Sequence, residues 1–242
     1  MGILDFLKNK KKLIDEKSEK IVLPNKEELK SNLDKIKNEI FKFLKPLGFK
    51  KKVRAFNRQT ENGIYQVINI QRGQVYSTLY GSFTINLGIM AKEIYELDSY
   101  NKPKDFYQDY DCKIRERLSN LTIKNDFWWL ISDNVENTAK IINEGLNSKG
   151  FEWLNALETR EKIIKNWVTM ADSNSPRAKL DVAIITLGLD RENGIKLIND
   201  YYRKVNNKSP HKDYVKELAE KLDIKLIKSI WIKIKYNKSP NG

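Results

Sequence analysis

The sequence predicts an α+β fold with an N-terminal helix, a four-stranded and mostly antiparallel sheet, and a C-terminal helical bundle. Three observations predict it. Apolar residues recur at helical spacing over residues 26–45, they alternate with polar residues over about the next forty positions, and helical spacing returns after Trp129. Strands and helices that are segregated along a chain are typical of α+β domains, whereas a parallel βαβ fold would alternate them.

The first helix is predicted over residues 26–45. Asn25 can cap its N-terminus, and Glu28 stands three residues further on, as in a capping box. Helical spacing follows in the apolar residues Leu29, Leu33, Ile36, Ile40, Phe43, Leu44 and Leu47. Pro46 and Gly48 are expected to end the helix, because neither residue continues a helix well.

Four strands are predicted between residues 49 and 121. The segment Phe49–Arg58 has strand character, and residues 64–71 and 83–89 alternate apolar with polar positions. The turn residues Glu61-Asn62-Gly63 indicate a hairpin. A fourth strand is expected over residues 112–121, and its apolar positions on one side are Cys112, Ile114 and Leu118. We therefore expect a sheet that is covered mainly on one side.

The second half of the chain is predicted to be a series of helices. Asp133 is expected to cap one helix and Ser175-Pro176 another, and helical spacing continues to Leu222. A soft boundary lies near residues 171–176. The predicted segments are a basic N-terminal segment (1–25), an α+β domain (26–170), a small helical region (171–223) and a basic tail (224–242).

Positive charge is concentrated at the two ends of the chain. The sequence has 45 Lys and Arg residues against 32 Asp and Glu, a formal net charge of +13. Residues 1–52 carry +7 and residues 224–242 carry +5, which leaves +1 for the body. A basic whole domain would indicate a nucleic-acid surface, but basic ends on a neutral body are also typical of solvated tails. Both alternatives stay open.

Residues 1–12 resemble a short interfacial anchor, because they combine the apolar residues Ile3, Leu4, Phe6 and Leu7 with four lysines. The alternative is a short helix docked on the body. The segment is too short to cross a bilayer, and no other stretch approaches the roughly 18 apolar residues that a crossing requires. We expect a cytoplasmic protein, and the lone Cys112 fits a reducing compartment.

Several kinds of catalytic or cofactor site lack their residues. A single cysteine, Cys112, excludes an intramolecular disulfide, and a single histidine, His211, excludes a multi-histidine metal site. Neither G-x-x-x-x-G-K-[ST] nor G-x-G-x-x-G occurs, so no phosphate loop is predicted and no cofactor is expected.

Carboxylates could still bind Mg²⁺ for phosphodiester cleavage. The densest acidic run is Asp105, Asp109 and Asp111. A restriction-type nuclease would need Glu and Lys on the central strand, where this chain has Gln71 and Arg72. Asp109 and Asp111 are therefore expected to be loop residues beside a strand.

The polar positions of the predicted strands are the candidate binding site. If the strands pair, they form an exterior surface of amides and guanidinium groups, made of Asn57, Arg58, Asn69, Gln71, Thr84, Asn86, Arg115 and Arg117. Such groups suit recognition of backbone, carboxylate or phosphate, and they supply no general base near neutral pH. The alternative is an ordinary solvated sheet face, or amides that hold a loop by hydrogen bonds.

An ordered set of short motifs resembles one bacterial family. The motifs are Phe43-Leu-Lys-Pro-Leu-Gly-Phe-Lys-Lys-Lys52, Phe56-Asn-Arg58, Gln66-Val-Ile-Asn-Ile-Gln71, Phe83-Thr-Ile-Asn-Leu-Gly-Ile89, Ile114-Arg-Glu-Arg-Leu118 and Asp126-Phe-Trp-Trp-Leu130. Over about residues 27–150 the chain resembles the "domain of unknown function 4304" family. The resemblance implies a bacterial origin and an α+β domain, and it implies no activity. Small proteins of this kind often resemble immunity proteins or accessory proteins of antiviral defence.

We therefore expect a non-catalytic binding protein that acts by protein–protein contact, in an immunity-like or phage-defence accessory role. One alternative is a nucleic-acid-binding protein that uses its basic ends and the Arg, Asn and Gln face. The other is a metal-dependent phosphodiesterase that uses Asp109 or Asp111. An inhibitor of a basic nuclease should be acidic at its contact, so the partner of this chain would have to be acidic or meet the neutral body.

Overall fold

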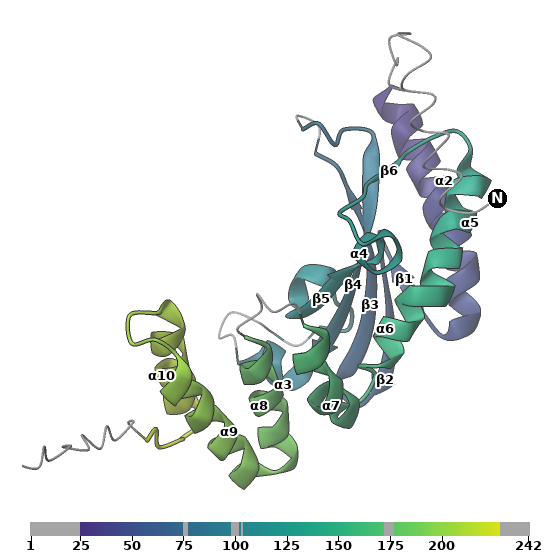
Figure 1. Cartoon of the computed structure of the whole chain (residues 1–242). Helices are drawn as coiled ribbons and strands as arrows, with labels where there is room; N and C mark the ends of the chain where they lie inside the picture. Colours follow the sequence, from purple (N-terminus) through teal and green to yellow (C-terminus); the bar gives the residue numbers. More distant parts are fainter. Residues whose placement is uncertain (1–24, 75–76, 98–101, 103, 172–176, 228–242) are drawn as a thin grey trace, which may run out of the picture. The chain divides into compact units, whose positions relative to one another are not determined.

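A computed structural model describes residues 25–74, 77–97, 102, 104–171 and 177–227. The chain divides into two compact units with the boundary between Trp167 and Val168, and each unit is described by itself (Figure 1). The predicted anchor over residues 1–12, the Ser175-Pro176 cap and most of the basic tail lie outside the described residues. In the described part of the chain, no helix has both the length and the apolarity that a membrane crossing requires.

The predicted α+β class is confirmed, with more strands than the sequence suggested. The sheet of unit 1 has the order β1-β2-β3-β4-β5, all antiparallel, and β6 pairs with the same side of β4 as β5 does. Its strands are β1 (Lys50–Lys52), β2 (Ala55–Glu61), β3 (Ile64–Arg72), β4 (Ser82–Ala91), β5 (Ile114–Arg117) and β6 (Trp129–Leu130).

The helices of unit 1 include the long predicted N-terminal one. They are α2 (Lys26–Leu44), α3 (Lys92–Glu96), α4 (Leu118–Ile123), α5 (Val135–Gly145), α6 (Phe151–Asn155) and α7 (Arg160–Met170), with short helical turns η1 (Lys45–Leu47), η2 (Asp109–Asp111) and η3 (Leu146–Gly150). Asn25 caps α2 as predicted, since its side chain accepts a hydrogen bond from the Glu28 backbone N–H at 2.9 Å. The cap of α5 is Asn134, one residue after the predicted Asp133.

Two predicted strands are wrong in their bounds. The segment Phe49–Arg58 is a hairpin, because the chain reverses at Val53, whose φ of 55° lies in the left-handed region. The predicted strand over residues 112–121 ends at Arg117, and α4 begins at Leu118. Leu118 turns into the helical layer, where its side chain lies against Gly150, and a continued strand would not reach that position.

One face of the sheet packs against helices. Figure 1 shows α2 and α5 lying side by side along the sheet, and the two helices contact one another. Phe41 of α2 stacks on Phe56 of β2 with ring centroids 6.0 Å apart. Phe56 pairs across the strands with Ile68, which pairs with Leu87, and all three are fully buried. Each such side chain contributes about 1.5–3 kcal/mol of hydrophobic stabilisation.

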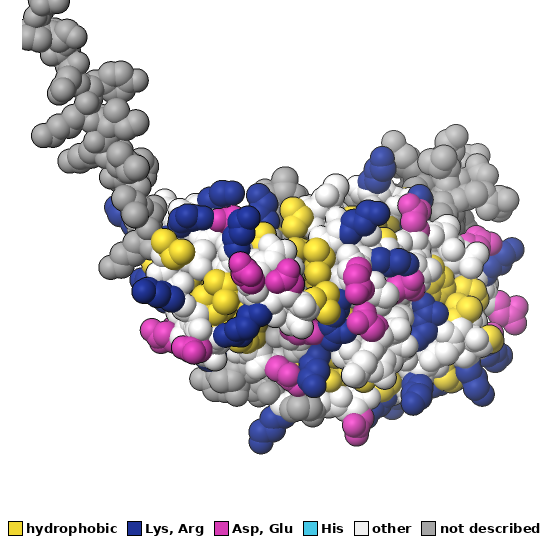
Figure 2. Space-filling model, turned by 90° about the horizontal axis from the view of Figure 1, so that it is seen from below, with side chains coloured by type: hydrophobic (Ala, Val, Ile, Leu, Met, Phe, Trp, Pro, Cys, Tyr) yellow, Lys and Arg dark blue, Asp and Glu magenta, His cyan; other side chains and the backbone are white. Residues whose placement is uncertain are grey.

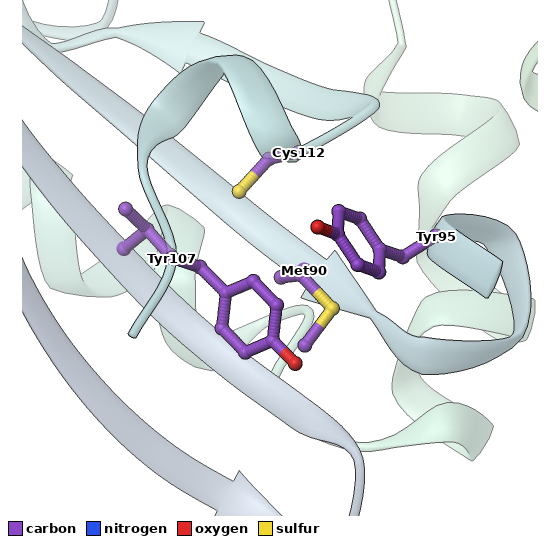
Figure 3. Close-up of a cluster of buried hydrophobic side chains, with 5 residues drawn as sticks. Met90, Tyr95, Tyr107 and Cys112 are labelled. Atoms are coloured by element: carbon purple, nitrogen blue, oxygen red, sulfur yellow. The ribbon is translucent and has the colours of Figure 1, made fainter. Parts of the chain in front are cut away.

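The second face of the sheet, opposite α2 and α5, is also covered in its middle. All ten residues of β4 are buried, which a sheet exposed on one side would not give. Figure 3 shows the apolar cluster responsible, in which Met90, Tyr95, Tyr107 and Cys112 converge with Val67. Tyr107 and Cys112 belong to the segment 104–113, so this segment forms the second cover of the sheet.

Unit 2 begins at Val168, within the last turn of α7, and its described residues are 168–171 and 177–227. Residues 177–227 contain three helices, namely α8 (Ala178–Leu189), α9 (Arg191–Lys204) and α10 (Pro210–Lys221). Helices α8 and α9 approach closely at Gly194, where an added Cβ would lie 2.4 Å from the Cα of Leu187. The buried Lys212 ammonium donates to the carbonyls of Tyr202 and Val205 near the C-terminus of α9. Burial lowers the pKa of Lys212, and the charge of Lys216 adds to this effect.

Gly88 should tolerate no side chain, because β4 passes directly beneath Cys112. An added Cβ would lie 2.7 Å from the Cys112 Sγ and 2.9 Å from its Cβ. We expect Gly88→Ala to lower the free energy of unfolding by about 1–3 kcal/mol, since overpacking forces side chains and backbone to move. Denaturant unfolding checks this. The double variant with Cys112→Ala should recover part of the loss, and an unchanged midpoint for Gly88→Ala alone would contradict the close approach.

Arg160 joins three elements of unit 1 through its guanidinium. It donates to Glu61 at 2.7 Å and to Glu93 at 2.5 Å, and so ties the end of β2 and helix α3 to the start of α7. Burial raises the pKa of Glu61, but the backbone N–H and guanidinium of Arg160 outweigh burial, so the pKa lies below its ordinary value.

We expect Arg160→Met to destabilise the fold by about 1–3 kcal/mol at neutral pH, and Arg160→Lys to recover little of it, because an ammonium cannot span both carboxylates. A carboxyl group whose pKa is lowered in the folded state stabilises the fold at pH values above its ordinary pKa. This stabilisation is lost as the pH falls through the lowered pKa. The stability gap between wild type and Arg160→Met should therefore narrow in acid. Unfolding curves over an acidic pH series measure this, and a gap that stays constant with pH would contradict the role of Glu61.

Candidate functional site

The polar residues of the second face surround a small hollow. Its volume is about 260 Å³, and it is lined by Gln71, Asn86, Asp109, Arg115, Glu116 and Arg117. Asn69, Asn86 and Arg117 form one cross-strand row over β3, β4 and β5. Four of the eight sequence-predicted residues (Gln71, Asn86, Arg115 and Arg117) thus line one hollow, and Asn69 lies in the same row.

Asp109 is the centre of this site, whereas the sequence analysis expected a loop residue or, in the phosphodiesterase alternative, a metal ligand. It is 8% exposed, and its two carboxylate oxygens accept hydrogen bonds from the side-chain amides of Asn69 and Asn86, each at 2.7 Å. The Asn86 amide also donates to Gln71 Oε1 at 2.8 Å. The strand amides therefore bind the covering segment. The sequence shows asparagines at polar positions of two predicted strands, but it holds no local signal that pairs them with Asp109.

Two other predicted residues also hold connecting segments. The Asn57 side chain exchanges two hydrogen bonds with the backbone of Tyr107, donating to its carbonyl at 2.8 Å and accepting from its N–H at 2.6 Å. Thr84 is fully buried, and its hydroxyl donates to the carbonyl of Phe127 at 3.3 Å. Asn57 and Thr84 thus lie on the second face but are closed off from a ligand.

Arg58 lies on the other face of the sheet, so the predicted grouping is wrong for this residue. Neighbouring strand residues point to opposite faces, and Arg58 pairs with Gln66 rather than with the row of Asn69. Its guanidinium donates to Gln66 Oε1 and to the carbonyl of Leu47. Burial lowers the pKa of Arg58 more than the charge of Glu158 raises it. Arg58 fastens η1 and α6 to the sheet.

The two arginines of β5 differ in whether their guanidinium groups are already paired. Arg117 is paired with Asp126, and its guanidinium carbon lies 5.4 Å from the ring centroid of Trp128. Arg115 is exposed, and its side chain has neither an ion pair nor a hydrogen bond with any residue that the structure describes. Arg115 is therefore the charged group of the hollow whose donors are available to a partner.

Asp111, like Asp109, is engaged in hydrogen bonds within unit 1. Asp111 accepts from Lys104 Nζ at 2.7 Å and from the Gln108 backbone N–H at 2.8 Å. The hydrogen bond to Asp111 raises the pKa of Lys104. In the described part of the chain, no group of three or more Asp, Glu, His or Cys side chains is arranged to hold a metal ion. The phosphodiesterase hypothesis stays a prediction.

A larger hollow of about 790 Å³ lies in unit 2 and holds none of the predicted site residues. Its lining is mainly apolar, with Val182, Leu197 and Tyr201 among its members, and His211 is at the same hollow. His211 is the helix residue whose backbone N–H donates to the capping Ser209. We assign no chemistry to this hollow.

The segment that forms the sheet and its polar row matches a known protein family. Residues 40–156 match the family described as "Domain of unknown function (DUF4304)". The match is confined to this segment, which is just under half of the chain. The resemblance seen in the sequence is confirmed, over a range that starts and ends later than about 27–150. The matched segment includes all six strands, α5 and the whole polar hollow, whereas unit 2 lies beyond it. The comparisons with curated proteins and with solved structures gave no match.

The Asp109 network should control access to Cys112. Burial raises the pKa of the Cys112 thiol well above its ordinary value, and the charges of Asp109 and Asp111 raise it further. Asp109→Ala removes the acceptor of the Asn69 amide and one of the two acceptors of the Asn86 amide. The cost is about 1–3 kcal/mol, so the covering segment should open more often. We expect Cys112 to react with a thiol reagent roughly tenfold faster or more.

The matched control is Asp105→Ala, which removes an exposed carboxylate from the same segment. Its thiol should react as slowly as that of wild type. Equal reaction rates for the Asp109 and Asp105 variants would show that the network does not hold the segment closed.

Proposed function

We propose that this chain is a non-catalytic binding protein that acts by contact with another protein in the bacterial cytoplasm. An immunity-like or phage-defence accessory role is the concrete form of the proposal. The observation that carries it is the state of the polar hollow. Its central carboxylate and its strand amides bind one another, and the exposed Arg115 guanidinium is left to face a partner.

The chemistry of the hollow suits a carboxylate of the partner. A guanidinium presents a planar fork of donors that matches a carboxylate in two parallel hydrogen bonds. Arg115 lies on β5, the last strand in the sheet order, and Arg117 lies two residues further on the same side. An acidic segment of a second protein could therefore approach along the edge of the sheet. This supports an acidic partner, which is one of the two alternatives that the charge of the chain leaves open.

The second candidate function is nucleic-acid binding, which the basic ends of the chain support. The amides of Asn69 and Asn86 contribute little to it, because both donate to Asp109. Figure 2 shows that, on the face in view, Lys and Arg side chains are interspersed with Asp and Glu. Affinity for nucleic acid would fall by several orders of magnitude between about 50 and 200 mM salt.

The test is partner capture followed by measured affinity. The wild-type chain is purified from its native cells, the co-purifying protein is identified and produced, and the dissociation constant is measured by calorimetry. We expect Arg115→Glu to weaken binding about 10–100-fold, since one buried charge pair is lost and replaced by repulsion. Lys140→Glu makes the same charge change at an exposed position of α5 and should change the constant less than about twofold.

An unchanged constant for Arg115→Glu would remove the hollow as the contact. Recovery of DNA or RNA in place of a protein, with binding that collapses as salt rises, would replace the proposal by the second candidate.

A further inference from the structure

The β1–β2 hairpin carries an apolar side chain in a costly position. Lys52 pairs with Ala55, so Val53 and Arg54 form a two-residue turn. Val53 has a φ of 55° and is 73% exposed. Positive φ is relaxed for Gly, Asn and Asp, whereas a β-branched residue there is strained. Val53 thus has a strained backbone that is not offset by burial of its side chain within the described chain. Such strain indicates a functional constraint.

Basic side chains surround this tip without acidic neighbours in the sequence. Residues 40–60 contain seven Lys and Arg residues and no Asp or Glu. Lys45, Lys50, Lys52 and Arg54 are exposed, and their side chains have no ion pair with any described residue. The hairpin is thus a concentrated positive charge on a body that is otherwise close to neutral.

The basic groups lie on both faces of the hairpin. Lys51 lies on the helix-covered side, where its ammonium donates to Asn38 and lies 4.7 Å from the Phe41 ring centroid. Lys50 and Lys52, one position away on either side, point to the opposite face. Val53 therefore projects from the end of a ribbon that is positively charged on both sides.

Unit 1 holds the base of the hairpin rigidly. Arg58 of β2 donates to the carbonyl of Leu47 at 3.0 Å, and its guanidinium carbon lies 4.8 Å from the ring centroid of Phe49. Leu47 is itself 39% exposed, beside Lys45 in η1. A second partly exposed apolar side chain is thus fixed near the lysines at the base of the hairpin.

We propose that the β1–β2 hairpin docks on an anionic lipid surface, with Val53 inserted among the headgroups and Lys50, Lys52 and Arg54 bound to lipid phosphates or carboxylates. The same cations could bind the phosphates of a nucleic acid. An apolar tip gains nothing from phosphates alone, whereas at a bilayer it enters the apolar boundary while the flanking cations stay at headgroup level. The apolar residue at the strained position therefore favours lipid. The proposal is independent of the Arg115 contact.

The test is co-sedimentation with two kinds of vesicle, one of phosphatidylcholine alone and one that also contains about 30% phosphatidylserine. We expect binding only to the second kind. The double variant Lys50→Glu/Lys52→Glu should lower the partition coefficient at least about tenfold. The control Lys140→Glu/Lys165→Glu makes the same total charge change at two exposed lysines on α5 and α7 and should leave most of the binding intact.

Val53→Asn separates insertion from simple charge attraction. Asn adopts positive φ with less strain than Val, so the variant should unfold at a higher denaturant concentration. Because Asn is polar, the variant should bind phosphatidylserine-containing vesicles roughly fivefold less tightly. The matched variant Leu130→Asn, at a residue that is 55% exposed on β6, should leave vesicle binding unchanged. Arg115→Glu should also leave it unchanged, which separates this proposal from the protein contact.

Three results would overturn the proposal. The first is equal binding to both kinds of vesicle, or binding to neither. The second is a Val53→Asn variant that binds anionic vesicles as tightly as wild type does. The third is tighter binding to a DNA fragment than to the anionic vesicles, with DNA affinity lost in the double lysine variant.

Discussion

The carboxylate of Asp109 is the constraint on which the second face of the sheet depends. It lies in the middle of the covering segment 104–113, whose only regular element is the short turn η2, and two strand amides hold it in place. The same segment brings Tyr107 and Cys112 onto the sheet, so the hydrogen bonds of Asp109, together with those between Asn57 and Tyr107, position an apolar cluster. A buried carboxylate is costly unless its oxygens are bonded, and here each oxygen has a partner.

The local features of this fold could be predicted from the sequence, and the tertiary ones could not. Helix α2 and its Asn25 cap depend on residues three and four positions apart, which a pattern can reveal. The hairpin at Val53 was missed because valine is no turn signal, and only the pairing of β1 with β2 forces the reversal. The end of β5 was missed because Leu118 continues the alternation but packs into the helical layer.

The arrangement of the candidate binding residues could be predicted from the sequence only in part. Strand parity alone separates Asn57 from Arg58, since adjacent strand residues face opposite sides. Asp109 bonds to Asn69, 40 positions away, and to Asn86, 23 positions away, and no local sequence pattern contains such contacts. The amides of Asn69 and Asn86 therefore proved to be partners of the chain itself. Among the described residues that line the hollow, the Arg115 guanidinium has its donors available.

The free edge of the sheet carries a further consequence. Strand β1 ends the strand order on its side, and its three residues Lys50, Lys51 and Lys52 are all exposed. An open strand edge is a template on which another extended chain can add and begin aggregation. A second copy that paired there would set ammonium groups against ammonium groups along the whole short strand, so the lysine run protects the sheet from edge-to-edge association.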